Sequence, residues 1–341
     1  MLDFSHGGDV EQFALELSCE ENQIIDLSSN INFLKPQVNL NLNNINISTY
    51  PTYSKLYQSI SDNYKTSIDN IELFNGGSSA IFSLFEFLKL KHCTIYSPAY
   101  LEYKKAAITY GYEYDLINRF TNITRAIQEN SLVIFVNPST PDGKYYDIEE
   151  YLEAWNKLGC TVLIDESFLD FTNYKSVIRY VNKYKNLYVL KSMTKYYSCA
   201  GIRCGVIVSN TTNIQKLKRT QAQWKLSSLD SEYLIQALKD NDFKQTTKAI
   251  NIRNHELLYK VLKEFIYTDI IYQSDANFFL IKLKNISAKT LQEYLKTYKI
   301  MIRDCSNFDF LDNSYIRVAV KSELSIVILQ NALNDIVNKI N

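Results

Sequence analysis

Glycine is scarce in this chain of 341 residues: nine glycines are well below the usual share of about 7%. A composition that avoids glycine keeps it where the backbone requires it, so each remaining glycine marks a candidate turn or close approach. The nine positions are Gly7, Gly8, Gly76, Gly77, Gly111, Gly143, Gly159, Gly201 and Gly205. Most of them fall in the segments that carry the polar residues discussed below.

Histidine is also rare, and no two cysteines have a CxxC spacing. The three histidines, His6, His92 and His255, lie far apart without an HExxH-like spacing, so we expect no metal site. The six cysteines are scattered and form no CxxC pair. The opening MLDFSHGGDV lacks the charged and apolar regions of a signal peptide, which favours a reduced cytoplasmic protein.

Net charge and long apolar runs are absent as well. Lysine plus arginine equals aspartate plus glutamate at 37 each, so no overall field would recruit nucleic acid or an anionic membrane. No apolar run approaches the roughly 18 residues of a membrane span. Any anionic ligand must therefore be bound by local charges.

Short apolar runs alternate with helical patterns through the middle of the chain. Several runs are nearly all apolar, which is typical of strands in a sheet covered on both faces. The runs are 92–98, 132–138, 161–168, 187–193 and 204–209, and the helical patterns are 80–90, 148–159 and 213–224. This order predicts an α/β fold with a mostly parallel sheet and right-handed crossovers.

The last hundred residues change character and predict a smaller α+β domain. Its elements are strands at 276–283, 300–304 and 315–320, and helices at 288–298 and 323–340. We expect an amino-terminal arm over residues 1–40 that packs with this small domain. A large α/β domain would then cover 41–230 and the small domain 231–341.

Polar residues gather where the predicted strands end, which is where open α/β sheets bind ligands. In FNGGSSAIF, Gly77 and Ser78 begin a helix whose free N–H groups suit a phosphate, although an ordinary cap has the same composition. In SPAYLEY, Tyr100 could stack on a flat ring, although 26 tyrosines make a chance aromatic common. Asn137 of NPSTPDGK is explained equally well as a turn residue.

Two further strand ends define the chemistry. Asp165 of IDES follows an apolar run, and a buried carboxylate requires a cation or a protonated ring nitrogen as its partner. In KSMTKYYSCAGIRCGVIV, an apolar setting favours the neutral, nucleophilic form of Lys195, while Ser192 and Arg203 suit a phosphate. An aldehyde, a phosphate, a flat ring and a basic ring nitrogen are the features of pyridoxal 5'-phosphate (PLP).

On these residues the chain resembles the fold-type I PLP enzymes of the class I/II aminotransferase superfamily over nearly its full length. The matching motif is S-x-x-K followed eight residues later by R. The resemblance implies a mostly parallel seven-stranded sheet flanked by helices and a homodimer with shared active sites. By this resemblance Lys195 would bond covalently to the cofactor aldehyde, and Asp165 would pair with the pyridine nitrogen. Asn137 would contact the ring hydroxyl, and Tyr100 would stack on the ring. The cofactor phosphate would be held by Gly77, Ser78, Ser192 and Arg203, with Tyr50 reaching in from the second subunit.

Two positions depart from the pattern of that superfamily. Relatives often carry a tyrosine three residues after the aspartate to bond the ring hydroxyl, and Phe168 stands there in this chain. The phosphate loop reads NGGSS, where many relatives carry an acidic residue at its end. Neither departure removes the lysine chemistry.

Four other segments, HGGD (6–9), DLSSNINFLKP (26–36), MIRDCSNF (301–308) and YIRVAVKS (315–322), look like those of the threonine-phosphate decarboxylases of cobamide biosynthesis. This resemblance implies decarboxylation of an O-phospho-L-amino acid: threonine phosphate to 1-amino-2-propanol phosphate, or serine phosphate to ethanolamine phosphate. The residues that would bind the carboxylate and phosphate of the substrate are His6, Asn30, Asn137, Arg303 and Arg317.

Two alternatives stay open. An aminotransferase of the histidinol-phosphate type would use the same residues with 2-oxoglutarate as a second substrate. A regulator that binds the cofactor without turnover would require an attached DNA-binding segment, and no such domain precedes residue 40.

Overall fold

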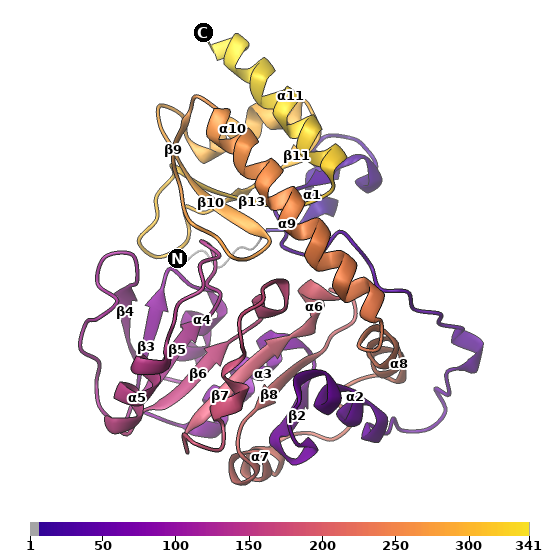
Figure 1. Ribbon diagram of the computed structural model, residues 1–341, viewed down its shortest axis with the longest axis vertical. Helices are drawn as coiled ribbons and strands as arrows, with labels where there is room; N and C mark the ends of the chain where they lie inside the picture. Colours follow the sequence, from indigo (N-terminus) through magenta and orange to yellow (C-terminus); the bar gives the residue numbers. More distant parts are fainter. Residues whose placement is uncertain (1–6, 341) are drawn as a thin grey trace.

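The predicted apolar runs form the centre of a seven-stranded sheet in the computed structural model, which describes residues 7–340 (Figure 1). The strand order is β2-β8-β7-β6-β5-β3-β4. In chain order the strands are β2 (Ile71–Phe74), β3 (His92–Ser97), β4 (Glu113–Asn118), β5 (Leu132–Val136), β6 (Thr161–Asp165), β7 (Leu187–Ser192) and β8 (Gly205–Val208). Strand β8 runs antiparallel to both of its neighbours and the other pairs are parallel, so the mostly parallel α/β sheet is confirmed.

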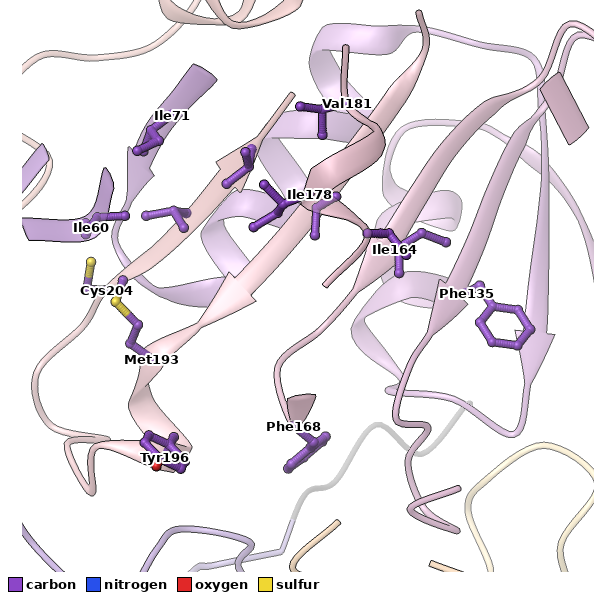
Figure 2. Packing of buried hydrophobic residues seen from close by; sticks show 14 of the residues in the cluster. Ile60, Ile71, Phe135, Ile164, Phe168, Ile178, Val181, Met193, Tyr196 and Cys204 are labelled. Atoms are coloured by element: carbon purple, nitrogen blue, oxygen red, sulfur yellow. The ribbon is translucent and has the colours of Figure 1, made fainter. Parts of the chain in front are cut away.

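Helices cover both faces of this sheet. One face packs against α3 (Gly76–Leu88), α4 (Glu102–Thr109) and α7 (Thr211–Lys218). The other packs against α2 (Ser54–Tyr64), α5 (Glu149–Lys157) and α8 (Ser228–Ala237). Ile134 belongs to the first core, whereas its neighbour Phe135 belongs to the second and is seen there with Ile164 in Figure 2. Successive residues of a strand point to opposite faces, so two covered faces explain why the central strands are mostly apolar.

The small domain contains a four-stranded antiparallel sheet of order β12-β13-β10-β9. Its elements are β9 (Thr268–Ile271), β10 (Phe278–Leu283), α10 (Ala288–Lys296), β12 (Arg303–Asp304), β13 (Tyr315–Ala319) and α11 (Glu323–Ile340). The single strand predicted at 300–304 is wrong, because it divides at Ile302 into β11 (Ile300–Met301) and β12, which belong to different sheets.

Strand β11 pairs in parallel with β1 (Ile25–Asp26) of the amino-terminal arm, which also carries α1 (Val10–Glu16). Leu27 of the arm is fully buried in the core of the small domain. The arm is thereby fixed to the small domain, and the residues after Leu27 lead toward the large domain.

The long helix α9 (Asn241–Glu264) connects the two domains (Figure 1). Phe243 near its start belongs to the core of the large domain, and Leu258 near its end belongs to the core of the small domain. Leu234 of α8 is also part of the large-domain core, so that core continues past residue 230, where the sequence had placed a boundary. Within residues 7–340, no helix combines the length and the apolar character needed to cross a bilayer.

Candidate active site

A cavity of about 320 Å³ lies where the carboxyl ends of β6 and β7 meet the first turn of α3. The arm and the strands β12 and β13 of the small domain form its opposite wall. Predicted site residues that line it are Asn30, Gly77, Ser78, Tyr100, Asp165, Ser192, Lys195, Arg203, Arg303 and Arg317. The structure therefore brings together residues that are spread over most of the chain.

Lys195 lies on the one-turn helix α6 (Met193–Tyr196), directly after β7. Its Nζ has no hydrogen-bond partner among residues 7–340 and lies 5.3 Å from the centroid of the Phe168 ring. Burial lowers the pKa of Lys195, and although Asp165 opposes this shift, the charges of Arg317 and Arg203 add to it. A larger fraction of this side chain is thus neutral than for an exposed lysine, as a nucleophilic amine requires.

Asp165 is 4% exposed at the end of β6, and both of its carboxylate oxygens accept hydrogen bonds. Oδ2 accepts from the hydroxyl of Tyr103 at 2.7 Å, and Oδ1 accepts from the backbone N–H of Ser167 at 2.9 Å and from its hydroxyl. These donors fix the direction in which the carboxylate faces the cavity. The sequence analysis gave no role to Tyr103, although it lies in SPAYLEY one helical turn after Tyr100.

An anion site forms where Gly76 and Gly77 at the start of α3 meet Ser192 and Arg203. Gly76 has a φ of +83°, and a Cβ there would overlap the guanidinium of Arg203. A Cβ on Gly77 would lie 3.4 Å from Cβ of Ser192. A guanidinium, a hydroxyl and the free N–H groups of a 13-residue helix thus converge, an arrangement that suits a phosphate dianion.

Tyr100 and Ser78 form the wall beside this anion site. The Ser78 and Tyr100 hydroxyl oxygens lie 3.1 Å apart, and the Tyr100 ring packs edge to face against Tyr103 with centroids 6.3 Å apart. Burial raises the pKa of the Tyr100 phenol, so the hydroxyl stays protonated at neutral pH. Tyr100 lines the cavity, and its stacking on the cofactor ring stays a prediction.

Arg303 and Arg317 stand opposite each other on the paired strands β12 and β13 and are 8% and 9% exposed. Arg317 donates to the carbonyl of Ser28 at 2.8 Å and to Oγ1 of Thr140 at 3.2 Å. Burial lowers the pKa of Arg317 to about 10, an effect that Cys305 opposes and Arg303 reinforces. Arg317 forms no ion pair with a carboxylate within residues 7–340, so an anionic ligand would compensate its charge.

Asn30 of the arm completes this wall. Its Oδ1 is buried without a hydrogen-bond partner in the described part of the chain, and its backbone carbonyl accepts from Nδ2 of Asn277 at 3.0 Å. Buried amide groups are normally bonded, so an unpartnered one beside two arginines indicates a contact completed by a ligand.

Two of the predicted residues that the structure describes, Asn137 and Tyr50, do not line the cavity. Both amide atoms of Asn137 are bonded at 2.9 Å to the backbone of Tyr146, so its contact with the ring hydroxyl stays a prediction. Tyr50 is 71% exposed and stacks on Trp224 with centroids 4.1 Å apart. His6 lies outside the described residues.

The sequence analysis missed Thr140, whose hydroxyl accepts a hydrogen bond from Arg317. A buried network of polar side chains positions Thr140. Arg119 donates to the Thr140 carbonyl at 2.9 Å and forms an ion pair with Asp142. The hydroxyl of Ser139 also donates to Asp142. This network fixes the loop after β5 so that Thr140 meets Arg317.

Comparison with known proteins identifies the family. Residues 23–336 match the family model for aminotransferase class I and II. The chain belongs to this family, and its cofactor is PLP. The residues present fit that cofactor, since one cavity holds an anion site, a buried carboxylate with fixed orientation and a lysine amine that has no hydrogen-bond partner within residues 7–340.

Three relatives illustrate the range of the family. The chain is 28% identical to the adenosylcobalamin biosynthesis bifunctional protein CobDQ of Leptospira interrogans, covering 93% of this chain and 39% of that protein. It is 27% identical to the threonine-phosphate decarboxylase of Salmonella typhimurium, covering 98% of both chains. The crystal structure of the histidinol-phosphate aminotransferase from Clostridium acetobutylicum superposes with a TM-score of 0.84 at 29% identity, covering 93% of this chain and 100% of that one.

Proposed function

We propose that this enzyme decarboxylates an O-phospho-L-amino acid, either L-serine phosphate to ethanolamine phosphate or L-threonine phosphate to 1-amino-2-propanol phosphate. The observation that carries the proposal is the pair Arg303 and Arg317, which lies beside Asn30 and faces the same cavity as Lys195. The start of α3 already supplies a site for the cofactor phosphate. A second group of cationic donors suits a substrate that brings two anions of its own, a carboxylate and a phosphate.

The roles of the residues follow from this arrangement. When bound, PLP supplies an electron sink for the bond that breaks at the α-carbon of the substrate. Asp165 stabilises a proton on the ring nitrogen. The two arginines would bind the distal phosphate and leave the carboxylate free to depart as CO2. Because Lys195 favours its neutral form, its Nζ would first take up a proton from solvent and then deliver it to the α-carbon in place of the carboxylate.

The alternative is an aminotransferase of the histidinol-phosphate type, which the similarity to the Clostridium acetobutylicum enzyme favours. In that case the arginines would hold the phosphate of histidinol phosphate, or a carboxylate of the glutamate and 2-oxoglutarate pair, and Lys195 would remove the proton from the α-carbon. The same side chains suit either reaction, because the choice depends on which group of the substrate Arg303 and Arg317 would bind and therefore on which bond at the α-carbon would be set to break.

The test is to mix the PLP-loaded enzyme separately with O-phospho-L-serine, O-phospho-L-threonine and L-histidinol phosphate, each with and without 2-oxoglutarate. CO2, phosphorylated amine and glutamate are measured together. CO2 released without a keto acid supports the proposal, and glutamate formed without CO2 contradicts it. The two phospho-amino acids differ by one methyl group, a contact worth about 1 to 3 kcal/mol, so their relative kcat/KM identifies the preferred one.

We also propose a homodimer in which Tyr50 completes the cavity of the partner subunit. In support, Tyr50 and Trp224 form an exposed aromatic stack, and Leu42 and Ile47 in the same segment are 69% and 86% exposed. This segment stands out from the large domain in Figure 1. Mixing inactive Tyr50→Ala and Lys195→Ala proteins under conditions of subunit exchange should restore about a quarter of the activity, because half of the dimers are mixed and each has one intact site. No recovery despite proven exchange contradicts a shared site.

A further inference from the structure

Lys104 and Asp309 form an ion pair that connects the two domains across the rim of the cavity. Lys104 lies on α4 of the large domain, and Asp309 lies in the loop between β12 and β13 of the small domain. Their side chains are only 10% and 18% exposed. This pair therefore differs from the solvent-exposed ion pairs of the surface, which contribute little.

Each partner is attached to a different wall of the active site. Lys104 follows Tyr100, which lines the cavity, by one helical turn. Asp309 directly follows Phe308, which lines the cavity on the side of the small domain. The ion pair thus joins the wall that would hold the cofactor to the wall that would hold the substrate.

Within the loop, further contacts lead from Asp309 to Arg303. The side chain of Asn307 accepts a hydrogen bond from Nη2 of Arg303 at 2.8 Å, and the guanidinium of Arg303 lies 5.6 Å from the centroid of the Phe308 ring. A displacement of residues 305–311 would therefore move two groups that touch Arg303.

Among the described residues, a small apolar cluster also joins this loop to the large domain. Phe308 belongs to a small apolar cluster with Cys305 and Leu280, and Phe120 of the large domain packs against that cluster. A cluster of this size supplies much less cohesion than the main cores, so a charge pair largely removed from water is a major part of the attachment.

We propose that Lys104 and Asp309 are positioning residues that hold the loop 305–311 against the large domain and thereby place Arg303 and Phe308 for substrate binding. This inference rests on the proposed function for the identity of the substrate, whereas the attachment of the loop does not depend on the reaction. The pair touches neither the anion site of α3 nor Lys195. Its loss should weaken substrate binding and leave the chemical step intact.

The experiment compares Lys104→Met, Asp309→Asn, the double variant and the reversed pair Lys104→Asp/Asp309→Lys, all as PLP-loaded enzyme. The matched control is Arg253→Met/Glu323→Gln, which removes an ion pair between α9 and α11 with side chains 69% and 54% exposed. Two quantities are measured: KM and kcat with the phospho-amino acid that is turned over, and amide hydrogen exchange of residues 305–311 without substrate.

We expect each single variant to raise KM on the order of tenfold, with kcat changed less than about twofold. The double variant should be no worse than the singles, since one interaction is lost in each case. The reversed pair should recover most of the affinity, and the control should resemble the parent. Exchange of residues 305–311 should be faster in the single variants and slower again in the reversed pair.

If amide hydrogen exchange of residues 305–311 is the same in Lys104→Met as in the parent, the ion pair does not hold the loop, whichever substrate the enzyme uses. An unchanged KM, or losses that add in the double variant, would overturn the role of the pair as well. Failure of the proposed function has a different signature: none of the phospho-amino acids is decarboxylated by the parent enzyme, while the exchange of the loop still responds to the variants.

Discussion

The hydroxyl of Tyr103 donates a 2.7 Å hydrogen bond to Asp165 from a position that is itself closed to solvent. Burial, followed by the charge of Asp165, raises the pKa of Tyr103 well above its usual value, so the phenol remains a hydrogen-bond donor at neutral pH. Asp165 would pair with the ring nitrogen of the cofactor, and the hydrogen bond from Tyr103 holds the Asp165 carboxylate in its orientation.

Replacing Tyr103 with phenylalanine should weaken PLP binding by about tenfold, because one of the donors that orient the carboxylate is lost. The dissociation constant is measured by titrating the apoenzyme with PLP and following visible absorbance. Tyr112→Phe is the control, since its hydroxyl bonds to the backbone of Phe85 and Leu90 in the same core, away from the cavity. Equal PLP affinities of Tyr103→Phe and the parent would refute the supporting role.

Gly76→Ala should lower PLP affinity by at least tenfold, because the new Cβ meets the Arg203 guanidinium and displaces it from the anion site. Gly111→Ala is a close control: its φ of +70° imposes similar backbone strain, but nothing lies within 4 Å of the added Cβ. Both variants should lose about 1 kcal/mol or more of stability in urea titrations. The prediction fails if the two show the same affinity for PLP.

The fold was predictable where local sequence decides it. Strand β5 is apolar throughout, and β6 and β7 are apolar except near their ends, because both faces of the sheet are covered; their runs were therefore recognisable. Strand β4 was missed because it lies at the edge of the sheet, and its first two residues are exposed. The strand predicted at 300–304 divides because Ile302 donates its N–H to the Gln292 side chain in place of a neighbouring strand.

The same distinction applies to the site. A single segment, from the end of β7 to the start of β8, contains Ser192, Lys195 and Arg203. Their spacing in the sequence was therefore enough to indicate the cofactor site. The contacts that were missed join distant segments: Tyr103 to Asp165 across 62 residues, Arg317 to Thr140 across 177, and Lys104 to Asp309 across 205. The first contact depends on how α4 packs on the sheet, and the other two depend on how the two domains pack; no local pattern encodes either arrangement.

The protonation of Lys195 should respond to its charged neighbours in opposite directions. Its pKa already lies below the usual lysine value, chiefly through burial. In Arg317→Met a positive neighbour is lost, so the pKa should rise and the amine fraction at neutral pH should fall. In Asp165→Asn a negative neighbour is lost, so the pKa should fall further and the amine fraction should rise.

Competitive acetylation of the apoenzyme across the neutral and alkaline range measures these shifts. The rate at Lys195 is compared by peptide mass spectrometry with the rate at the exposed Lys89 of the same sample. Shifts of the same sign in the two variants would show that the neighbouring charges do not control the amine.

Lys191→Met should destabilise the protein by about 3 to 5 kcal/mol, because it leaves buried carboxylates without their cation. Lys191 and Glu166 are each 2% exposed and form an ion pair of 2.9 Å on the side of the sheet away from the cavity, with Asp170 at 3.6 Å. Urea titration gives the free energy of unfolding. Lys157→Met, which breaks an exposed pair with Glu153, is the control and should change it by about 0.5 kcal/mol or less.

The double variant Lys191→Met/Glu166→Gln separates the loss of the ion pair from the cost of an uncompensated charge. Glu166 accepts the backbone N–H of Val177 on Oε1 and the hydroxyl of Ser176 on Oε2. In a glutamine the remaining oxygen can keep the bond from Val177, and the amide NH2 can donate to the hydroxyl oxygen of Ser176. We therefore expect the double variant to regain part of the lost stability, with Asp170 retaining its bond from Tyr64. If the double variant is less stable than Lys191→Met alone, the carboxylate of Glu166 is stabilised by those donors and not by Lys191.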